Sequence, residues 1–157
     1  MLKYTITDYE RGFLEGIIDG EGSLSLKKLK RRTTGVWSVD VLIVNTSYEL
    51  IEKVRGICER FSVNSGSIME VTGKKRQEAG DKWKECYMYR IPTHIVRELL
   101  PQLTLIAKER QRRLILVALE LIGHHLRRDR TEEENKELEA VYDDLKELNR
   151  RGKHVIL

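Results

Sequence analysis

Two acidic residues, Asp19 and Glu21, alternate with Gly20 and Gly22 directly after an apolar segment. Residues 13–18 are apolar except for one glutamate and one glycine, and they predict the last turns of a helix that breaks at the glycines. Because the helix dipole favours cations at the carboxyl end, two carboxylates placed there suit a bound metal cation. The plainer alternative is a glycine C-cap followed by solvent-facing acids, and it is favoured for either acid taken alone.

The same predicted helix carries Gly12 and Gly16, which are four residues apart and share one face. A face without side chains lets a second backbone come close, as small residues do between membrane helices. The rest of the helix is apolar nearly all round, which predicts burial. We therefore expect another helix to pack along Gly12 and Gly16.

Residues 13–22 read Phe-Leu-Glu-Gly-Ile-Ile-Asp-Gly-Glu-Gly and resemble the signature of the LAGLIDADG homing endonucleases. The match departs from the signature at Glu15, where the pattern has alanine, and at Glu21, where it often has aspartate. Glu21 keeps the carboxylate and with it the chemistry. The order of predicted elements over about residues 8–122 is also similar to the single-motif, homodimeric branch of this family.

Hydrophobic periodicity and capping residues predict an α+β chain with the element order α-β-β-α-β-β-α-α-α. The resemblance implies that these elements form an αββαββα LAGLIDADG core with an antiparallel DNA-binding sheet and extra C-terminal helices. We expect one domain over residues 1–157, with the core at 8–122 and a helical extension at 123–157. The predicted helices are about 8–19, 47–61, 93–100, 104–122 and 131–150, and the predicted strands are 23–30, 36–44, 65–71 and 82–91.

Three local predictions are specific enough to test. Thr46 and Glu49 have the spacing of a capping box at the start of the second helix. The fourth strand has two registers, with either Tyr87 and Tyr89 or Cys86 and Met88 on its inner face. The buried stripe of the long helix is predicted to include Leu105, Leu114, Val117, Ala118 and Leu121.

The composition sets limits on the class of protein. Lys and Arg exceed Asp and Glu by 29 to 25, a modest excess that is compatible with nucleic acid but does not establish it. Cys58 and Cys86 stand apart, which favours a reducing, intracellular setting, the cytoplasm of a prokaryote or an organelle. The sequence has no pattern typical of a signal peptide or a membrane span, so we expect neither secretion nor a membrane partner.

The chemistry expected of the motif is phosphodiester cleavage, for which two divalent metals about 4 Å apart activate water and stabilise charge. Mg²⁺ is the expected ion, with Mn²⁺ as a substitute. One motif per chain predicts a homodimer that brings two copies of Glu21 together. The resemblance implies that Glu21 binds metal, that the Gly20 carbonyl adds a ligand, and that Asp19 holds the turn at the dimer interface.

The resemblance also implies further site residues. A polar residue follows the second strand in the family, which corresponds to Asn45 here, with Thr46 as the alternative. A lysine after Pro101 corresponds to Lys108, expected near the scissile phosphates, with Arg113 as support. For Lys108 and Arg113 an ordinary solvated cation on a charged helix is the favoured alternative.

The two predicted hairpins carry the DNA recognition, because a two-stranded ribbon fits the major groove. Basic loops at 28–32 and 74–76 are expected to grip phosphate, and a dimer would cover about 20 bp. Each side chain taken singly could equally be solvated surface. The predicted DNA-contacting residues are Ser25, Lys27, Arg31, Ser38, Asp40, Met69, Lys74, Lys75, Arg76, Glu85 and Tyr87.

These observations predict a homodimeric, Mg²⁺-dependent, site-specific endonuclease of double-stranded DNA, with an intron favoured over an intein as host. The alternatives are an RNA splicing maturase, for which intron RNA is the partner, and a DNA-binding regulator that does not cleave. A helical scaffold protein is the plainest alternative, and gel filtration with labelled duplex tests it, since a scaffold should not shift the duplex.

Overall fold

The computed structural model describes residues 3–29, 36–71, 85–123 and 130–151. The chain forms two compact units: unit 1 comprises residues 1–23 and 41–103, and unit 2 comprises residues 24–40 and 104–157. The division falls within two strands, so each of these strands contributes residues to both units. The single domain expected from the sequence stays a prediction.

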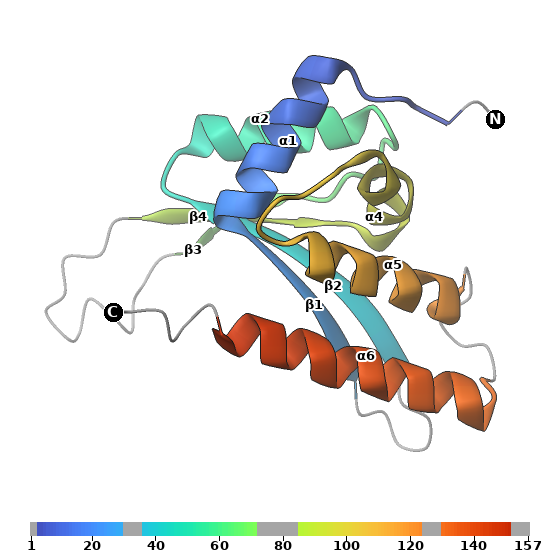
Figure 1. Ribbon diagram of the computed structural model, residues 1–157. Coiled ribbons are helices and arrows are strands. Elements are labelled where there is room, and N and C mark those ends of the chain that lie inside the picture. The colour runs from blue at the N-terminus through green and yellow to red at the C-terminus, as the bar shows by residue number, and fades with distance from the viewer. Residues whose placement is uncertain (1–2, 30–35, 72–84, 124–129, 152–157) are drawn as a thin grey trace, which may run out of the picture. The chain divides into compact units, whose positions relative to one another are not determined.

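The predicted order of helices and strands is confirmed (Figure 1). The sheet is antiparallel, with strand order β1-β2-β4-β3. The elements are α1 (Asp8–Glu21), β1 (Gly22–Leu29), β2 (Val36–Asn45), α2 (Tyr48–Glu59), β3 (Ile68–Val71), β4 (Cys86–Ile91), α4 (Thr93–Leu99), the 3-10 helix η1 (Leu100–Gln102), α5 (Glu109–Ile122) and α6 (Glu132–Arg151).

In unit 1, α1 begins at a capping box formed by Thr7 and Glu10. The Glu10 carboxylate is buried, accepts hydrogen bonds of 2.9 Å from both the Thr7 N–H and the Tyr4 hydroxyl, and lies 3.1 Å from the Arg60 guanidinium. Although burial opposes it, this set of partners lowers the pKa of Glu10. Sequence reasoning missed this buried acid, because its charged partner, Arg60, is 50 residues away, directly after α2.

The core of unit 1 lies on the face of the sheet formed by Val41, Ile43, Tyr89 and Ile91. Ile43 pairs with Tyr89 and Val41 with Ile91, so these side chains point to the same side. Tyr89 is fully buried, donates its hydroxyl hydrogen to the Ser65 carbonyl, and has a pKa raised by burial. Its burial decides the register left open by the sequence: Tyr87 and Tyr89, not Cys86 and Met88, lie on the core side.

The start of α2 differs from the prediction. Its N-cap is Ser47, whose hydroxyl accepts a hydrogen bond from the Leu50 N–H, and the expected Thr46–Glu49 capping box is wrong. The cause is the Asn45 side chain, which accepts the Ser47 N–H at 2.8 Å and turns the chain one residue further before the helix begins.

In unit 2, the side chains of β1 and β2 alternate between the two faces of the sheet, with apolar side chains on the core side as predicted. Leu24 and Leu26 are buried on β1, and Trp37 and Val39 are buried on β2. Helix α6 covers these residues: the Tyr142 ring meets Trp37 edge-on, with ring centroids 5.9 Å apart. Glu139 pairs with Lys28, and Asn149 donates to the Leu24 carbonyl, so α6 is attached to β1 at two points.

Helix α5 starts later than expected and turns a different side inward. Residues 104–108 are not helical, because the Glu109 carboxylate accepts the Leu105 N–H at 2.9 Å and so caps a turn that precedes the helix. The predicted stripe is wrong in part, since Val117 is 44% exposed. The buried residues of α5 are Ile115, Ala118, Leu119 and Ile122. Residues 114–119 are all apolar, so the sequence allows more than one stripe.

Helix α6 agrees with the prediction. Thr131 and Glu134 form a capping box at its start, and Leu138, Val141 and Leu145 are buried. Among the helices that the structure describes, none combines the length and hydropathy needed to cross a membrane.

Candidate functional site

Glu21 is the last residue of α1, and its side chain is exposed. The chain passes directly from α1 into β1 at Gly22, whose N–H donates to the Ile18 carbonyl. A Cβ at Gly22 would lie 2.7 Å from that carbonyl oxygen, closer than real Cβ atoms come. Glycine at this position therefore permits the tight junction that holds Glu21 at the boundary between helix and strand.

The glycine face of α1 is formed by Gly12, Gly16 and Gly20, spaced four residues apart. All three are exposed, and a Cβ built on any of them meets no atom of the chain within 4 Å. The opposite side of α1 is buried through Leu14, Ile17 and Ile18. The expectation that α1 is buried all round is therefore wrong for one chain, which covers one side and leaves the glycine face open.

Aromatic side chains border the glycine face near the start of α1. Tyr9 is 66% exposed and Phe13 is partly buried. The Lys53 ammonium of α2 lies 4.5 Å from the Tyr9 ring centroid and 5.2 Å from that of Phe13. Lys53 thus contacts both rings next to the glycines. The surface of α1 here combines apolar rings with backbone that no side chain covers.

The remaining residues of the predicted catalytic set fall in different units. Asn45 belongs to unit 1 with Glu21, and its side-chain oxygen is used by the turn before α2. Lys108 belongs to unit 2 and is the N-cap residue of α5, where its carbonyl accepts the Arg112 N–H. Asp19 is partly buried in the last turn of α1. The catalytic roles of these residues stay predictions.

The donor atoms at the end of α1 suit a hard divalent cation. Glu21 offers a carboxylate, and the last carbonyls of a helix lack partners within the helix, so the Gly20 carbonyl can add a second oxygen. In the parts of the chain that the structure describes, no three His, Cys, Asp or Glu side chains come together as a metal site. One chain therefore presents one acidic ligand at this turn and needs others to complete a coordination sphere.

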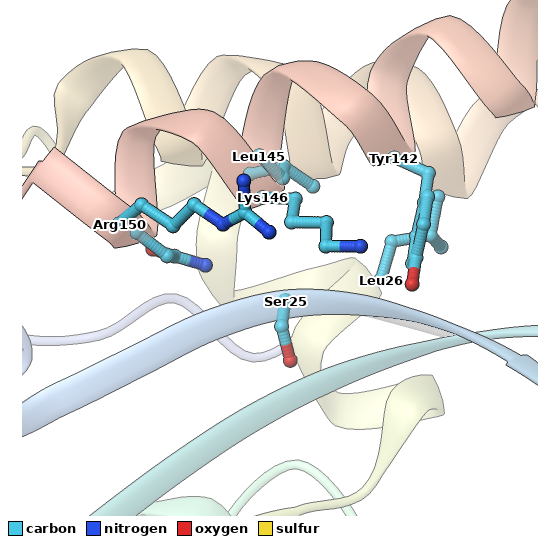
Figure 2. Close-up of a pocket in the computed structure, with 7 residues that line it drawn as sticks. Ser25, Leu26, Tyr142, Leu145, Lys146 and Arg150 are labelled. Carbon is cyan, nitrogen blue, oxygen red and sulfur yellow. The ribbon is translucent and has the colours of Figure 1, made fainter.

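The outward face of β1 and β2 in unit 2, called here the unit 2 open face, carries Ser25, Lys27, Ser38 and Asp40. Figure 2 shows the Ser25 side chain pointing away from α6. The Lys27 ammonium lies 2.8 Å from the Asp40 carboxylate, which is 8% exposed, whereas Lys27 is 47% exposed. Lys27 is therefore the member of the pair that can reach a ligand, and Asp40 holds it in place.

The corresponding surface of unit 1, the unit 1 open face, follows from the strand register. Leu42 pairs with Arg90, Val44 with Met88, and Met69 with Met88, so all five side chains point away from the core. Met69 is 55% exposed, and Arg90 is exposed as well. Sequence reasoning missed Arg90 and Met88, because the register of β4 was open.

Tyr87 does not lie on this face. It shares the core side with Tyr89, and its ring meets Tyr48 edge-on at a centroid distance of 5.2 Å. The prediction of Tyr87 as a DNA-contacting residue is wrong for this face, because the register places its ring on the core side. Glu85 is exposed directly before β4. The remaining predicted contacts, Arg31, Lys74, Lys75 and Arg76, lie outside the described residues.

The cations at the start of α5 are tied to an acid of the same helix. Glu109 lies 2.8 Å from Arg112 and 3.2 Å from Arg113. Hydrogen bonds from Arg112, assisted by the Leu105 N–H and Arg113, lower the pKa of Glu109 to about 2. Arg113, expected to support phosphate binding, thus has a structural partner within its own helix.

We expect Glu109→Gln to destabilise the fold by about 1–3 kcal/mol at neutral pH, because it removes a charged acceptor of several hydrogen bonds. Since folding lowers the Glu109 pKa from 4.5 to about 2, its contribution is present above pH 4.5 and is lost as the pH falls toward 2. Chemical denaturation of both proteins between pH 7 and about pH 2 measures this. Equal curves at pH 7 would contradict the assignment, and Glu133→Gln, which changes an exposed acid, is the control.

Comparison with known proteins agrees with this arrangement of helices, strands and turn. The fold is that of the LAGLIDADG homing endonucleases. The model of the LAGLIDADG-like domain matches residues 8–116, and the chain belongs to this family. Comparison with curated proteins gave no match.

Three solved structures share the fold. The archaeal intron-encoded homing endonuclease I-Vdi141I, complexed with DNA, has a TM-score of 0.52 and 20% identity over 88% of this chain and 98% of its own. I-GzeII, in complex with its DNA target, has a TM-score of 0.54 and 15% identity over 92% of this chain and 49% of its own. I-SmaMI, bound to cleaved DNA, has a TM-score of 0.56 and 20% identity over 89% of this chain and 44% of its own. This chain thus spans about half the length of the last two.

Proposed function

We propose that this protein is a site-specific endonuclease of double-stranded DNA that acts as a homodimer and depends on Mg²⁺. The observation that carries the proposal is the end of α1, where an exposed Glu21 follows a glycine face that the chain leaves uncovered. The structural relatives, which were solved with DNA, support a DNA substrate. An intron is the proposed host of the gene, and an intracellular location goes with it.

Dimerisation is supported by two properties of the chain. The glycine face offers close backbone approach, and the Tyr9 and Phe13 rings beside it add apolar area. One chain presents one acidic ligand at the turn. In a two-fold dimer that packs α1 on its partner's α1, both copies of Glu21 lie near the axis.

At the dimer axis, Glu21 and the Gly20 carbonyl would hold the metal. Bound Mg²⁺ supplies a polarised water and stabilises charge on the phosphate oxygens. Lys108 is proposed to contribute a positive charge next to the scissile phosphate, and Asn45 to orient water by hydrogen bonding.

The open faces are the proposed DNA contacts. On the unit 2 open face, Lys27 would donate hydrogen bonds to guanine or phosphate, and Asp40 keeps its ammonium in position. On the unit 1 open face, Arg90 suits guanine, while Met69 and Met88 suit the methyl groups of thymine. This division replaces the expectation that Asp40 and Tyr87 themselves read bases.

Cleavage of a random duplex library tests the proposal. The protein is incubated with the library and Mg²⁺, and the ends of the products are sequenced. We expect cuts at a related set of sites, with none formed in EDTA. Stable duplex binding without cuts would favour a regulator, and binding confined to intron RNA would favour a maturase.

A further inference from the structure

Helix α6 lies outside the residues matched by the family model, and its charges are divided between two sides. Asp144 and Glu147 face α5, where they line a depression together with Arg110 and Arg113. On this side acidic side chains of α6 lie next to basic side chains of α5, so their charges balance. The charges on this side of α6 therefore give no reason to expect a further ligand.

The other side of α6 adjoins β1, where Glu139 is neutralised by Lys28 and two further side chains are cationic. Lys146 and Arg150 line a cavity of about 300 Å³, whose floor includes Leu26 and Leu145 and which Ser25 also borders. Figure 2 shows both long side chains in the space between α6 and β1. Both are exposed, and in the described part of the chain neither takes part in an ion pair.

The part of α6 that carries these cations is held against β1 and β2 by its neighbours. Asn149 lies one residue before Arg150 and donates to the Leu24 carbonyl at 3.1 Å. Tyr142 packs on Trp37, and the Lys146 ammonium lies 5.7 Å from the Tyr142 ring centroid. The helix therefore holds two positive charges beside β1, which is an edge strand in the described sheet.

We propose that Lys146 and Arg150 bind the phosphate backbone of the DNA duplex that lies on the unit 2 open face. The proposal rests on the proposed DNA function and adds to it a contact from a helix outside the family core. Ser25 and Lys27 of β1 face the groove, whereas the two cations lie on the opposite side of the same edge strand. The major groove is about 8.5 Å deep. When β1 lies at the bottom of the groove, the phosphates along its rim therefore extend past β1 to the level of the two cations on α6.

Phosphate contacts of this kind have a quantitative signature. Each one releases counterions, and the logarithm of the binding constant falls with the logarithm of salt concentration by about 0.9 per contact. The double variant Lys146→Gln/Arg150→Gln should therefore lower the salt slope by about 1.8 for each protomer, or about 3.6 for the dimer on one duplex. It should weaken binding about tenfold at low salt and do so for all sequences alike.

The experiment measures binding of a random-sequence duplex of about 40 bp, twice the expected dimer span, over a range of salt concentrations in Ca²⁺. The control is Lys3→Gln/Lys136→Gln, which removes the same net charge from two exposed positions that do not line this cavity. We expect the control to keep the wild-type slope, and thermal unfolding checks that all three proteins are folded.

The outcomes separate the two claims. A steep wild-type slope that the Lys146→Gln/Arg150→Gln variant retains would overturn the phosphate contact alone. A slope lowered equally by both double variants would also overturn it, because net charge would then explain the effect. Absence of duplex binding by the wild-type protein would overturn the proposed DNA function and this contact with it.

Discussion

The Glu21→Gln protein should bind duplex DNA with an affinity equal to or above that of the wild type, yet cleave it about 10²–10⁴-fold more slowly. Glutamine keeps the size of the side chain and removes the charge that holds the metal, which costs several kcal/mol of charge stabilisation. Binding should not suffer, because a negative charge near the phosphates is lost. Duplex binding is measured in Ca²⁺ and cleavage in Mg²⁺, on the same duplex.

Asp8→Asn is the matched control for this change, since it neutralises an exposed carboxylate at the other end of α1. It should leave cleavage within about twofold of the wild type, and at most weaken the helix start by about 0.5 kcal/mol. Near-normal cleavage by Glu21→Gln would remove the metal site from this turn. Loss of both binding and cleavage would instead assign Glu21 a role in folding.

Gly16→Leu should produce a folded monomer. Within one chain the added side chain meets nothing, because a Cβ at Gly16 has no atom within 4 Å. In the proposed dimer the same side chain lies where two backbones touch, and overpacking costs about 1–3 kcal/mol at each of two symmetric positions. The dimer dissociation constant should therefore rise by about 10²-fold or more. Sedimentation velocity measures the change, and circular dichroism confirms that the helices remain.

The control is Glu120→Leu, which adds a leucine at an exposed position of a different helix, α5. It should leave the dimer intact, because Glu120 is not part of the glycine face. If Gly16→Leu and Glu120→Leu both stay dimeric, α1 does not form the dimer interface.

The order of elements was predictable because each is specified locally. Helix α1 has a cap, an apolar side and a terminal glycine, and α6 has the Thr131–Glu134 capping box. The alternation of Leu24 and Leu26 specified the core side of β1. The Phe13–Gly22 motif was sufficient to indicate the family, since its residues are contiguous.

Other features depend on contacts between distant residues. The register of β4 required the pairing of Tyr89 with Ile43 and its hydrogen bond to Ser65. The role of Asp40 required the position of Lys27 on the neighbouring strand. The start of α5 was set by the Glu109 side chain, which no periodicity reveals. The open glycine face appeared only once the buried side of α1 was known.

The central claim is that two copies of this chain form one cutting unit, each contributing Glu21. Its most direct test mixes wild-type and Glu21→Gln chains by co-refolding, at constant total protein, and measures double-strand cleavage. If both copies are needed, cleavage follows the square of the wild-type fraction, so an equal mixture retains about one quarter of the activity. Activity that falls in direct proportion, to about one half, would contradict the claim, because each chain would then cut alone.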